Sequence, residues 1–213
     1  MFIPPKSDIG MKELFYNATV RKYFISDMLD IPATQIRSVR LRNTFLRRLR
    51  HQKQGILDVC IELNDESKIN IEIQVRIYKY WDRRQLFYLA KMYTEDLMVG
   101  EDYSRLKRCV AISLLDFNLT DRPQYHSVYR LRDPEGHEFS DMLEVHIVEL
   151  RKKLAGENPV NEWIRLFNVE SMEELDMIRT NNPGIKEAIR ELRTMSLGRA
   201  LRYEYESYLK AKR

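Results

Sequence analysis

The sequence predicts an α/β protein with a mixed central sheet flanked by helices and a C-terminal helical extension. Residues 55–76 alternate between apolar and polar side chains in two arms, which is the period of half-buried strands. Residues 109–117 are almost wholly apolar, a run typical of a central strand covered on both faces. Apolar residues recur at helical spacing over residues 82–99 and in several segments beyond residue 160.

Length and composition limit the domain organisation. A chain of 213 residues suffices for one sizeable core with a small appendage, and we predict an α/β domain over residues 1–155 and a helical extension over 156–213. No apolar run approaches the length of a membrane span and the first residues do not form a secretory signal, so we expect a cytoplasmic protein. Cys60 and Cys109 are expected to be buried, reduced thiols rather than zinc ligands or a disulfide.

The N-terminal part predicts two helices, the first of which starts at Ser7-Asp8, and then a strand over residues 36–43. A basic block overlaps this strand, because no Asp or Glu occurs between Ile31 and Leu57. Such a block can neutralise phosphates without reading bases, although acids elsewhere in space can also offset it. Its cations are Arg37, Arg40, Arg42, Arg47, Arg48, Arg50 and Lys53.

Residues 55–76 predict a strand hairpin that closes at the polar turn 64–67. The apolar side chains of both arms must face the same side, so the numbers of directly paired residues must add to an even sum. A sum of 130 places Asp58 opposite Glu72, and a sum of 132 places Asp58 opposite Gln74. Either register gathers these three polar side chains in one small area.

Two carboxylates held close together on strands favour a hard divalent cation, which prefers oxygen ligands. We therefore consider Asp58 and Glu72 candidate ligands of Mg²⁺, with Mn²⁺ as a substitute, and Gln74 a candidate for holding an attacking water. The alternative is that these polar residues only face solvent, because the outer face of a hairpin usually does so.

The helix predicted after the hairpin starts at an Asp82 cap and ends at Gly100. Arg84 and Tyr88 lie one turn apart on it. A planar guanidinium suits phosphate, so Arg84 is a candidate phosphate contact, and an ion pair with a helix neighbour is its alternative role. The predicted buried stripe consists of Leu86, Leu89, Ala90, Tyr93 and Leu97.

The second half of the chain predicts strands over residues 109–117, 125–132 and 139–150, the last two joined by a turn at 133–136. His126, His137 and His146 lie in this region. Their spacing indicates no metal cluster, and we interpret them as ordinary surface or edge histidines.

The hairpin and the helix after it resemble a known family. The segments GILDV (55–59) and INIEIQV (69–75), with Trp81, Arg84 and Tyr88, resemble the recombination-promoting nuclease/putative transposase family of the PD-(D/E)xK nuclease superfamily. The resemblance runs from about residue 8 to residue 150, and more weakly to the C-terminus.

This resemblance implies a restriction-endonuclease-like fold in which Asp58 and Glu72 bind metal and the main-chain carbonyl of Ile73 completes the shell. Gln74 would take the position at which the superfamily usually has a lysine. The resemblance implies that the family itself has Gln there, so the departure is from the superfamily pattern. A neutral amide can orient water but cannot stabilise developing negative charge as an ammonium can. Asp8, Lys12 and Tyr88 match further family positions and are accessory candidates. A helix cap is the alternative role of Asp8, and packing is that of Tyr88.

The function predicted from the resemblance is metal-dependent hydrolysis of DNA phosphodiesters in transposition or recombination. Arg84 and the cluster of Arg47, Arg48 and Arg50 would hold the DNA backbone, with weak sequence preference. One alternative is a catalytically weak or inactive nuclease-like scaffold that binds DNA or a protein partner, which the missing lysine favours. Another is a metal-free protein-interaction module. No membrane partner is expected, and the sequence does not decide whether the protein forms a homo-oligomer.

Overall fold

The computed structural model describes residues 2–46 and 56–211, which form two compact units. The sheet unit comprises Arg37–Lys153, and the helical unit comprises the chain up to Ile36 together with the chain from Leu154 onward. The predicted division at residue 155 differs from this grouping, because the first 36 residues pack with the C-terminal helices. Across the described residues, no helix has both the length and the apolar character needed to cross a membrane.

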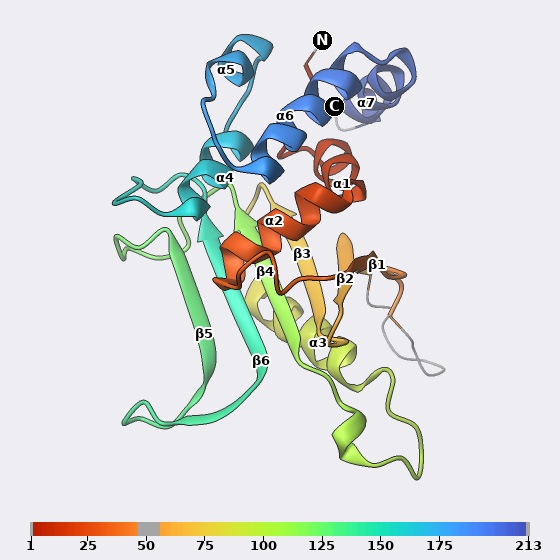
Figure 1. The fold of residues 1–213 in the computed structure, drawn as a ribbon, viewed down its shortest axis with the longest axis vertical. Coiled ribbons are helices and arrows are strands. Elements are labelled where there is room, and N and C mark those ends of the chain that lie inside the picture. Colours follow the sequence, from red (N-terminus) through yellow and green to blue (C-terminus); the bar gives the residue numbers. More distant parts are fainter. Residues whose placement is uncertain (1, 47–55, 212–213) are drawn as a thin grey trace. The chain divides into compact units, whose positions relative to one another are not determined.

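The sheet unit contains one six-stranded sheet in the order β1-β2-β3-β4-β6-β5 (Figure 1). β3, β4 and β6 run parallel to one another, whereas β1 and β2 extend the sheet antiparallel on one side and β5 on the other. The predicted mixed α/β class is therefore confirmed. The strands are β1 Val39–Leu41, β2 Val59–Leu63, β3 Lys68–Gln74, β4 Cys109–Leu115, β5 His126–Arg132 and β6 Glu138–Glu149.

The hairpin β2–β3 adopts one of the two predicted registers. Val59 pairs with Ile71 and Ile61 with Ile69, which is the sum of 130. In the turn, Asp65 accepts a hydrogen bond from the Ser67 main-chain N–H at 3.1 Å, which helps to close it. The paired residues begin at Val59, so Asp58 lies just outside the hairpin ladder.

The alternation predicted for the first arm breaks before β2. The chain bends at Asp58, and Leu57 packs in a cluster with Cys60 instead of sharing the face of Val59. The strand predicted over residues 36–43 is likewise shorter, because only Val39–Leu41 pairs with β2.

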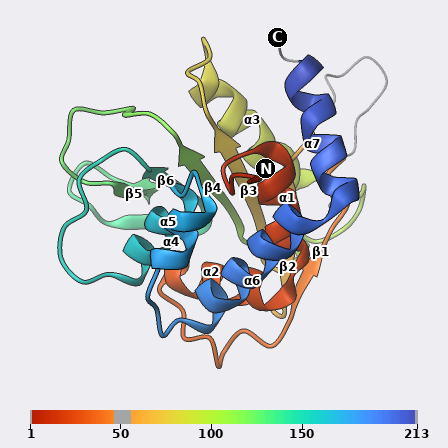
Figure 2. The same cartoon turned by 90° about the horizontal axis from the view of Figure 1, so that it is seen from above.

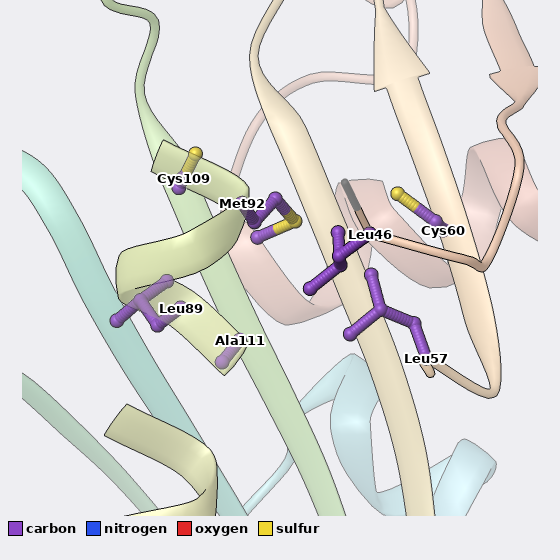
Figure 3. Packing of buried hydrophobic residues seen from close by; sticks show 7 residues of the cluster. All are labelled: Leu46, Leu57, Cys60, Leu89, Met92, Cys109 and Ala111. Carbon is purple, nitrogen blue, oxygen red and sulfur yellow. The ribbon is translucent and has the colours of Figure 1, made fainter. Parts of the chain in front are cut away.

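One helix of the sheet unit, α3 (Trp81–Thr94), packs against one face of the sheet. Leu89 and Met92 of α3 lie among Leu46, Cys60 and Cys109, as Figure 3 shows. Both thiols are free and buried, as predicted, and burial raises the pKa of each to about 12. A short 3-10 helix, Tyr103–Arg105, precedes β4.

The bounds and the buried stripe of α3 differ from the prediction. Asp82 lies in the first turn rather than at the cap, and the helix ends at Thr94 rather than near residue 99. Lys68 explains this end, because its Nζ donates to the Met92 carbonyl at 2.8 Å and lies 2.6 Å from Asp96. The buried positions are Trp81, Gln85, Leu89 and Met92, whereas Leu86 is exposed.

The helical unit is built around aromatic packing. Phe24 makes edge-to-face contacts with Phe15, Trp163 and Phe167 at ring-centroid distances of 4.9, 5.1 and 6.1 Å. α2 and α6 lie side by side in this unit (Figure 2). The helices are α1 Asp8–Tyr16, α2 Ala18–Leu29, α4 Pro159–Phe167, α5 Met172–Met177, α6 Pro183–Leu197 and α7 Arg199–Ala211.

Candidate functional site

The polar face of β3 is buried under α3. Lys68, Asn70, Glu72 and Gln74 alternate along the strand, and each is at most 9% exposed. Burial of polar groups is unfavourable unless they find partners, so a solvated outer face is the wrong description of this strand. This face is therefore a buried polar cluster of the sheet unit, in which side chains are held by hydrogen bonds.

Glu72 lies at the centre of this face and is held by three side chains. Its Oε2 accepts a hydrogen bond from Gln85 Nε2 at 2.7 Å, and its Oε1 accepts one from Asn70 Nδ2 at 3.2 Å. Arg84 Nη2 lies 3.6 Å from Oε2 and contributes a positive charge. The carboxylate is only 2% exposed, so these partners fix its orientation.

Asp58 belongs to the same region of the sheet unit. Burial raises the pKa of the Tyr88 phenol, the positive charge of Arg84 opposes this, and the negative charges of Glu72 and Asp58 raise it further. Asp58 and Glu72 are therefore both near enough to this phenol of α3 to act on it electrostatically.

Gln74 follows Glu72 on the same face and is 9% exposed. Its main-chain carbonyl accepts a hydrogen bond from Asp116 N–H at 2.9 Å, which ties the end of β3 to the end of β4. The side chain of the intervening Ile73 lies on the opposite face of β3 and is buried. The use of its carbonyl as a metal ligand stays a prediction.

Arg84 forms its ion pair across elements rather than along its helix. Its partner Glu72 lies on β3, and its guanidinium carbon is 5.7 Å from the Tyr78 ring centroid and 5.8 Å from that of Tyr88. The predicted alternative of a pair with a helix neighbour is therefore replaced by a pair with the site itself. Contact of Arg84 with phosphate stays a prediction.

Several other predicted residues pair with acids or fall outside the described residues. Arg47, Arg48 and Arg50 lie outside the described residues. Arg42, from the same basic block, pairs with Glu62 at 3.0 Å and Asp96 at 3.2 Å, so acids do offset part of the block. Asp8 and Lys12 belong to α1 of the helical unit and pair with each other at 3.1 Å, and Ser7 is the helix cap.

The neutral groups around Glu72 fit a hard cation. Three buried side-chain oxygens on this face have no hydrogen-bond partner within the described structure: Asn70 Oδ1, Gln85 Oε1 and Ser113 Oγ. Ser113 is the β4 residue in register with Glu72. Oxygen is the donor that Mg²⁺ prefers, and such atoms can also bind its waters.

A carboxylate-rich metal cluster is not part of this site. No group of three or more His, Cys, Asp and Glu side chains that could hold a metal occurs in residues 2–46 and 56–211. An ion here would therefore depend on two carboxylates, neutral oxygens and retained waters. Mg²⁺ is usually bound in this way, through one or two carboxylates.

The hydrogen bonds that Gln85 and Asn70 donate to Glu72 were not predicted from the sequence. Gln85 lies between Trp81 and Leu89 in the buried stripe, at spacings of four residues. A single polar residue in a stripe of this kind signals a buried polar partner, and that signal was available in the sequence.

The interpretation of the histidines as surface or edge residues is wrong for His146, whereas His126 does lie on the edge strand β5. His146 is 2% exposed, its Nδ1 lies 2.9 Å from His126 Nε2, and its Nε2 contacts Glu144. Arg108 and Arg130 also bind Glu144, at 3.0 and 2.7 Å. Burial, together with electrostatic repulsion from His146, lowers the pKa of His126 to about 4, so the His126 imidazole is neutral near pH 7. His137 is exposed and pairs with Asp133 at 3.0 Å.

Comparison with protein families shows a match that spans nearly the whole chain. A family model described as PD-(D/E)XK nuclease family transposase matches residues 5–213. Neither the curated proteins nor the solved structures yielded a match. The six-stranded mixed sheet with its buried acidic face agrees with the restriction-endonuclease-like fold that this description implies.

Proposed function

The chain belongs to the PD-(D/E)XK nuclease family of transposases, and on this premise we propose that it is a metal-dependent endonuclease that hydrolyses DNA phosphodiesters. The observation that carries the proposal is the buried Glu72 carboxylate, fixed by Gln85 and Asn70 on the polar face of β3. Its two hydrogen-bond donors are neutral amides, and its ion pair with Arg84 is long, at 3.6 Å, which leaves negative charge for a bound cation. A role in transposition or recombination is part of the proposal and rests on the family.

Asp58 and Glu72 would hold Mg²⁺ or Mn²⁺, with the Ile73 carbonyl as a further ligand. When bound, such an ion lowers the pKa of a coordinated water and offsets the charge on a phosphate. Gln74 shares the face of Glu72 and would orient the attacking water through its amide. Arg84 would hold a non-bridging phosphate oxygen, because its guanidinium already lies at the edge of the site.

Nicking of supercoiled plasmid tests this proposal. Purified protein is assayed with Mg²⁺, Mn²⁺ or EDTA, beside the isosteric variants Asp58→Asn and Glu72→Gln. Loss of a residue that merely orients a metal ligand costs about 10–100-fold, so loss of a ligand should reduce nicking by more than about 100-fold. EDTA should abolish it.

Glu62→Gln is the matched control. Glu62 is a carboxylate of the same hairpin, but its partner is Arg42, so nicking should stay close to that of the unmodified protein. Cleavage that persists in both Asp58→Asn and Glu72→Gln would assign the activity to another site or a contaminant, and would overturn the proposal.

A nuclease-like scaffold without turnover is the second candidate. The observation in its favour is Gln74, which supplies no positive charge where the superfamily usually has a lysine, while Lys68 on the same face is engaged with Asp96. Absence of nicking with any metal, together with salt-sensitive DNA binding, would support this candidate.

A further inference from the structure

An exposed aromatic and basic segment links the candidate site to α3. Between the end of β3 and the first turn of α3, Ile77, Tyr78 and Tyr80 are 66%, 53% and 55% exposed. This contrasts with the fully buried strand that precedes them. The same segment carries the cations Arg76, Lys79, Arg83 and Arg84 against the acid Asp82.

The cations lie against the two tyrosine rings. Lys79 Nζ is 4.9 Å and the Arg83 guanidinium carbon 4.8 Å from the Tyr80 ring centroid, within the range of cation–π attraction. The Arg84 guanidinium carbon lies 5.7 Å from the Tyr78 ring centroid. Each exposed ring is thus accompanied by positive charge, which is complementary to a strand of phosphates.

Tyr80 has a backbone conformation that residues other than glycine seldom adopt. Its φ of 64° and ψ of 30° are left-handed, and in the described structure only two other non-glycine residues have a positive φ. The conformation does not serve as a side-chain helix cap, because Tyr80 makes no capping hydrogen bond. Strained residues of this kind gather at binding and catalytic sites.

Arg84 connects this segment to the candidate site. The same guanidinium that lies near the Tyr78 ring is 3.6 Å from Glu72 Oε2. A phosphate held at Arg84 would therefore place the neighbouring nucleotide against Tyr78. The side chain of Arg84 thus spans from the Tyr78 ring to the Glu72 carboxylate.

We propose that Tyr78 and Tyr80 form a stacking platform for unpaired bases, so that the preferred substrate is DNA with single-stranded nucleotides beside the scissile phosphate. The inference rests on the proposed nuclease function for the position of the phosphate. Cations alone bind any nucleic-acid backbone, but exposed rings beside them favour bases whose faces are free. In a duplex those faces are covered by neighbouring base pairs.

The test measures binding in EDTA, where no cleavage occurs. A single-stranded oligonucleotide and the duplex of the same sequence are compared by fluorescence anisotropy, and 2-aminopurine in the single strand reports stacking. Alanine replacement of one stacking ring typically weakens binding by about tenfold or more. Tyr78→Leu/Tyr80→Leu should therefore weaken single-strand binding about 100-fold and abolish the fluorescence quenching, with duplex binding nearly unchanged.

Two variants serve as controls. Tyr78→Phe/Tyr80→Phe keeps both rings and should bind the single strand as the unmodified protein does. Tyr103→Leu removes a tyrosine of the sheet unit that lies outside the segment and is even more exposed, at 79%, and should have no effect.

Equal losses for the single strand and the duplex, or equal losses in the phenylalanine and leucine variants, would overturn the platform. So would unchanged binding in the leucine variant. Because the assay is independent of turnover, tyrosine-dependent single-strand binding without plasmid nicking in any metal would leave the platform standing and reject the nuclease function.

Discussion

The orientation of Glu72 depends on an amide from α3. Gln85 Nε2 makes the shorter of the two hydrogen bonds to this carboxylate, and the Gln85 side chain is 2% exposed. An amide is neutral, so it fixes the carboxylate without competing with a metal ion for its negative charge, as an ammonium would. We therefore regard Gln85 as a positioning residue for the proposed metal ligand.

Replacement of this residue gives a specific expectation. Gln85→Leu should lower nicking by about 10–100-fold and raise the Mg²⁺ concentration needed for half-maximal activity, because the ligand loses its orientation. Thermal stability should also fall, by about 1–3 kcal/mol, because the buried Glu72 Oε2 loses a hydrogen-bond donor.

Leu86→Ala is the control for Gln85→Leu, because Leu86 is the next residue of α3 and is exposed. A Mg²⁺ dependence that stays unchanged in Gln85→Leu while overall stability falls would show that Gln85 serves only the packing of α3.

Some residues of the site follow from a local sequence pattern, whereas others depend on tertiary packing. Alternation alone placed Glu72 and Gln74 on one face of β3, because a strand has only two faces, whereas Asp58 lies at a bend just before β2. Gln85 could not be placed beside Glu72 in that way, since the rotation of α3 over the sheet depends on packing of Trp81 and Leu89. Tertiary packing also decided that His146 is buried.

Elements were predicted best where a local pattern coincides with the tertiary environment. β4 is buried at every residue, as its apolar run indicated, and the β5–β6 hairpin closes at the predicted turn. α3 is shorter than predicted because Lys68, from another element, binds a carbonyl of its last turn. A helix end set by a distant side chain has no local signal.

The packing of α6 on α2 depends on a glycine. A Cβ added to Gly184 would lie 2.4 Å from Tyr23 Cβ and 3.1 Å from Trp163 Cζ2, so one helix must move to accept it. Gly184→Ala should lower the free energy of unfolding of the protein by about 1–3 kcal/mol, the usual cost of overpacking. Urea unfolding followed by circular dichroism measures this change.

Gly198→Ala provides the comparison for Gly184→Ala, because its added Cβ would meet its nearest atoms at 3.4 and 3.6 Å and its backbone is not left-handed. If Gly184→Ala were as stable as the unmodified protein, the close approach of α2 and α6 would not hold in solution.

At the scale of the whole molecule, charge distribution matters more than net charge. The chain carries a formal charge of +4, yet the described part of the basic block is partly neutralised, as Arg42 shows by pairing with Glu62 and Asp96. The cations that the sequence offers for long-range attraction of DNA are then Arg47, Arg48 and Arg50, together with those beside Tyr78 and Tyr80.

This distribution makes the salt dependence of binding a diagnostic measurement. Each phosphate contact adds about 0.9 to the slope of log affinity against log salt concentration for duplex DNA. Arg47→Glu/Arg48→Glu/Arg50→Glu should therefore reduce the slope by up to about 2.7, and it should weaken duplex and single-strand binding alike, because phosphates are common to both. The leucine variants of Tyr78 and Tyr80 should instead leave the slope unchanged and weaken only the single strand.

Net charge alone must be separated from local contact. Arg165→Glu/Arg179→Glu/Lys186→Glu alters the total charge equally but at exposed positions of the helical unit, so its slope should stay near that of the unmodified protein. Equal slopes in the two charge-reversed proteins would mean that DNA senses only the overall field. A slope lowered only by the first would place the backbone contact in the block just before Asp58, next to the carboxylates proposed to cleave it.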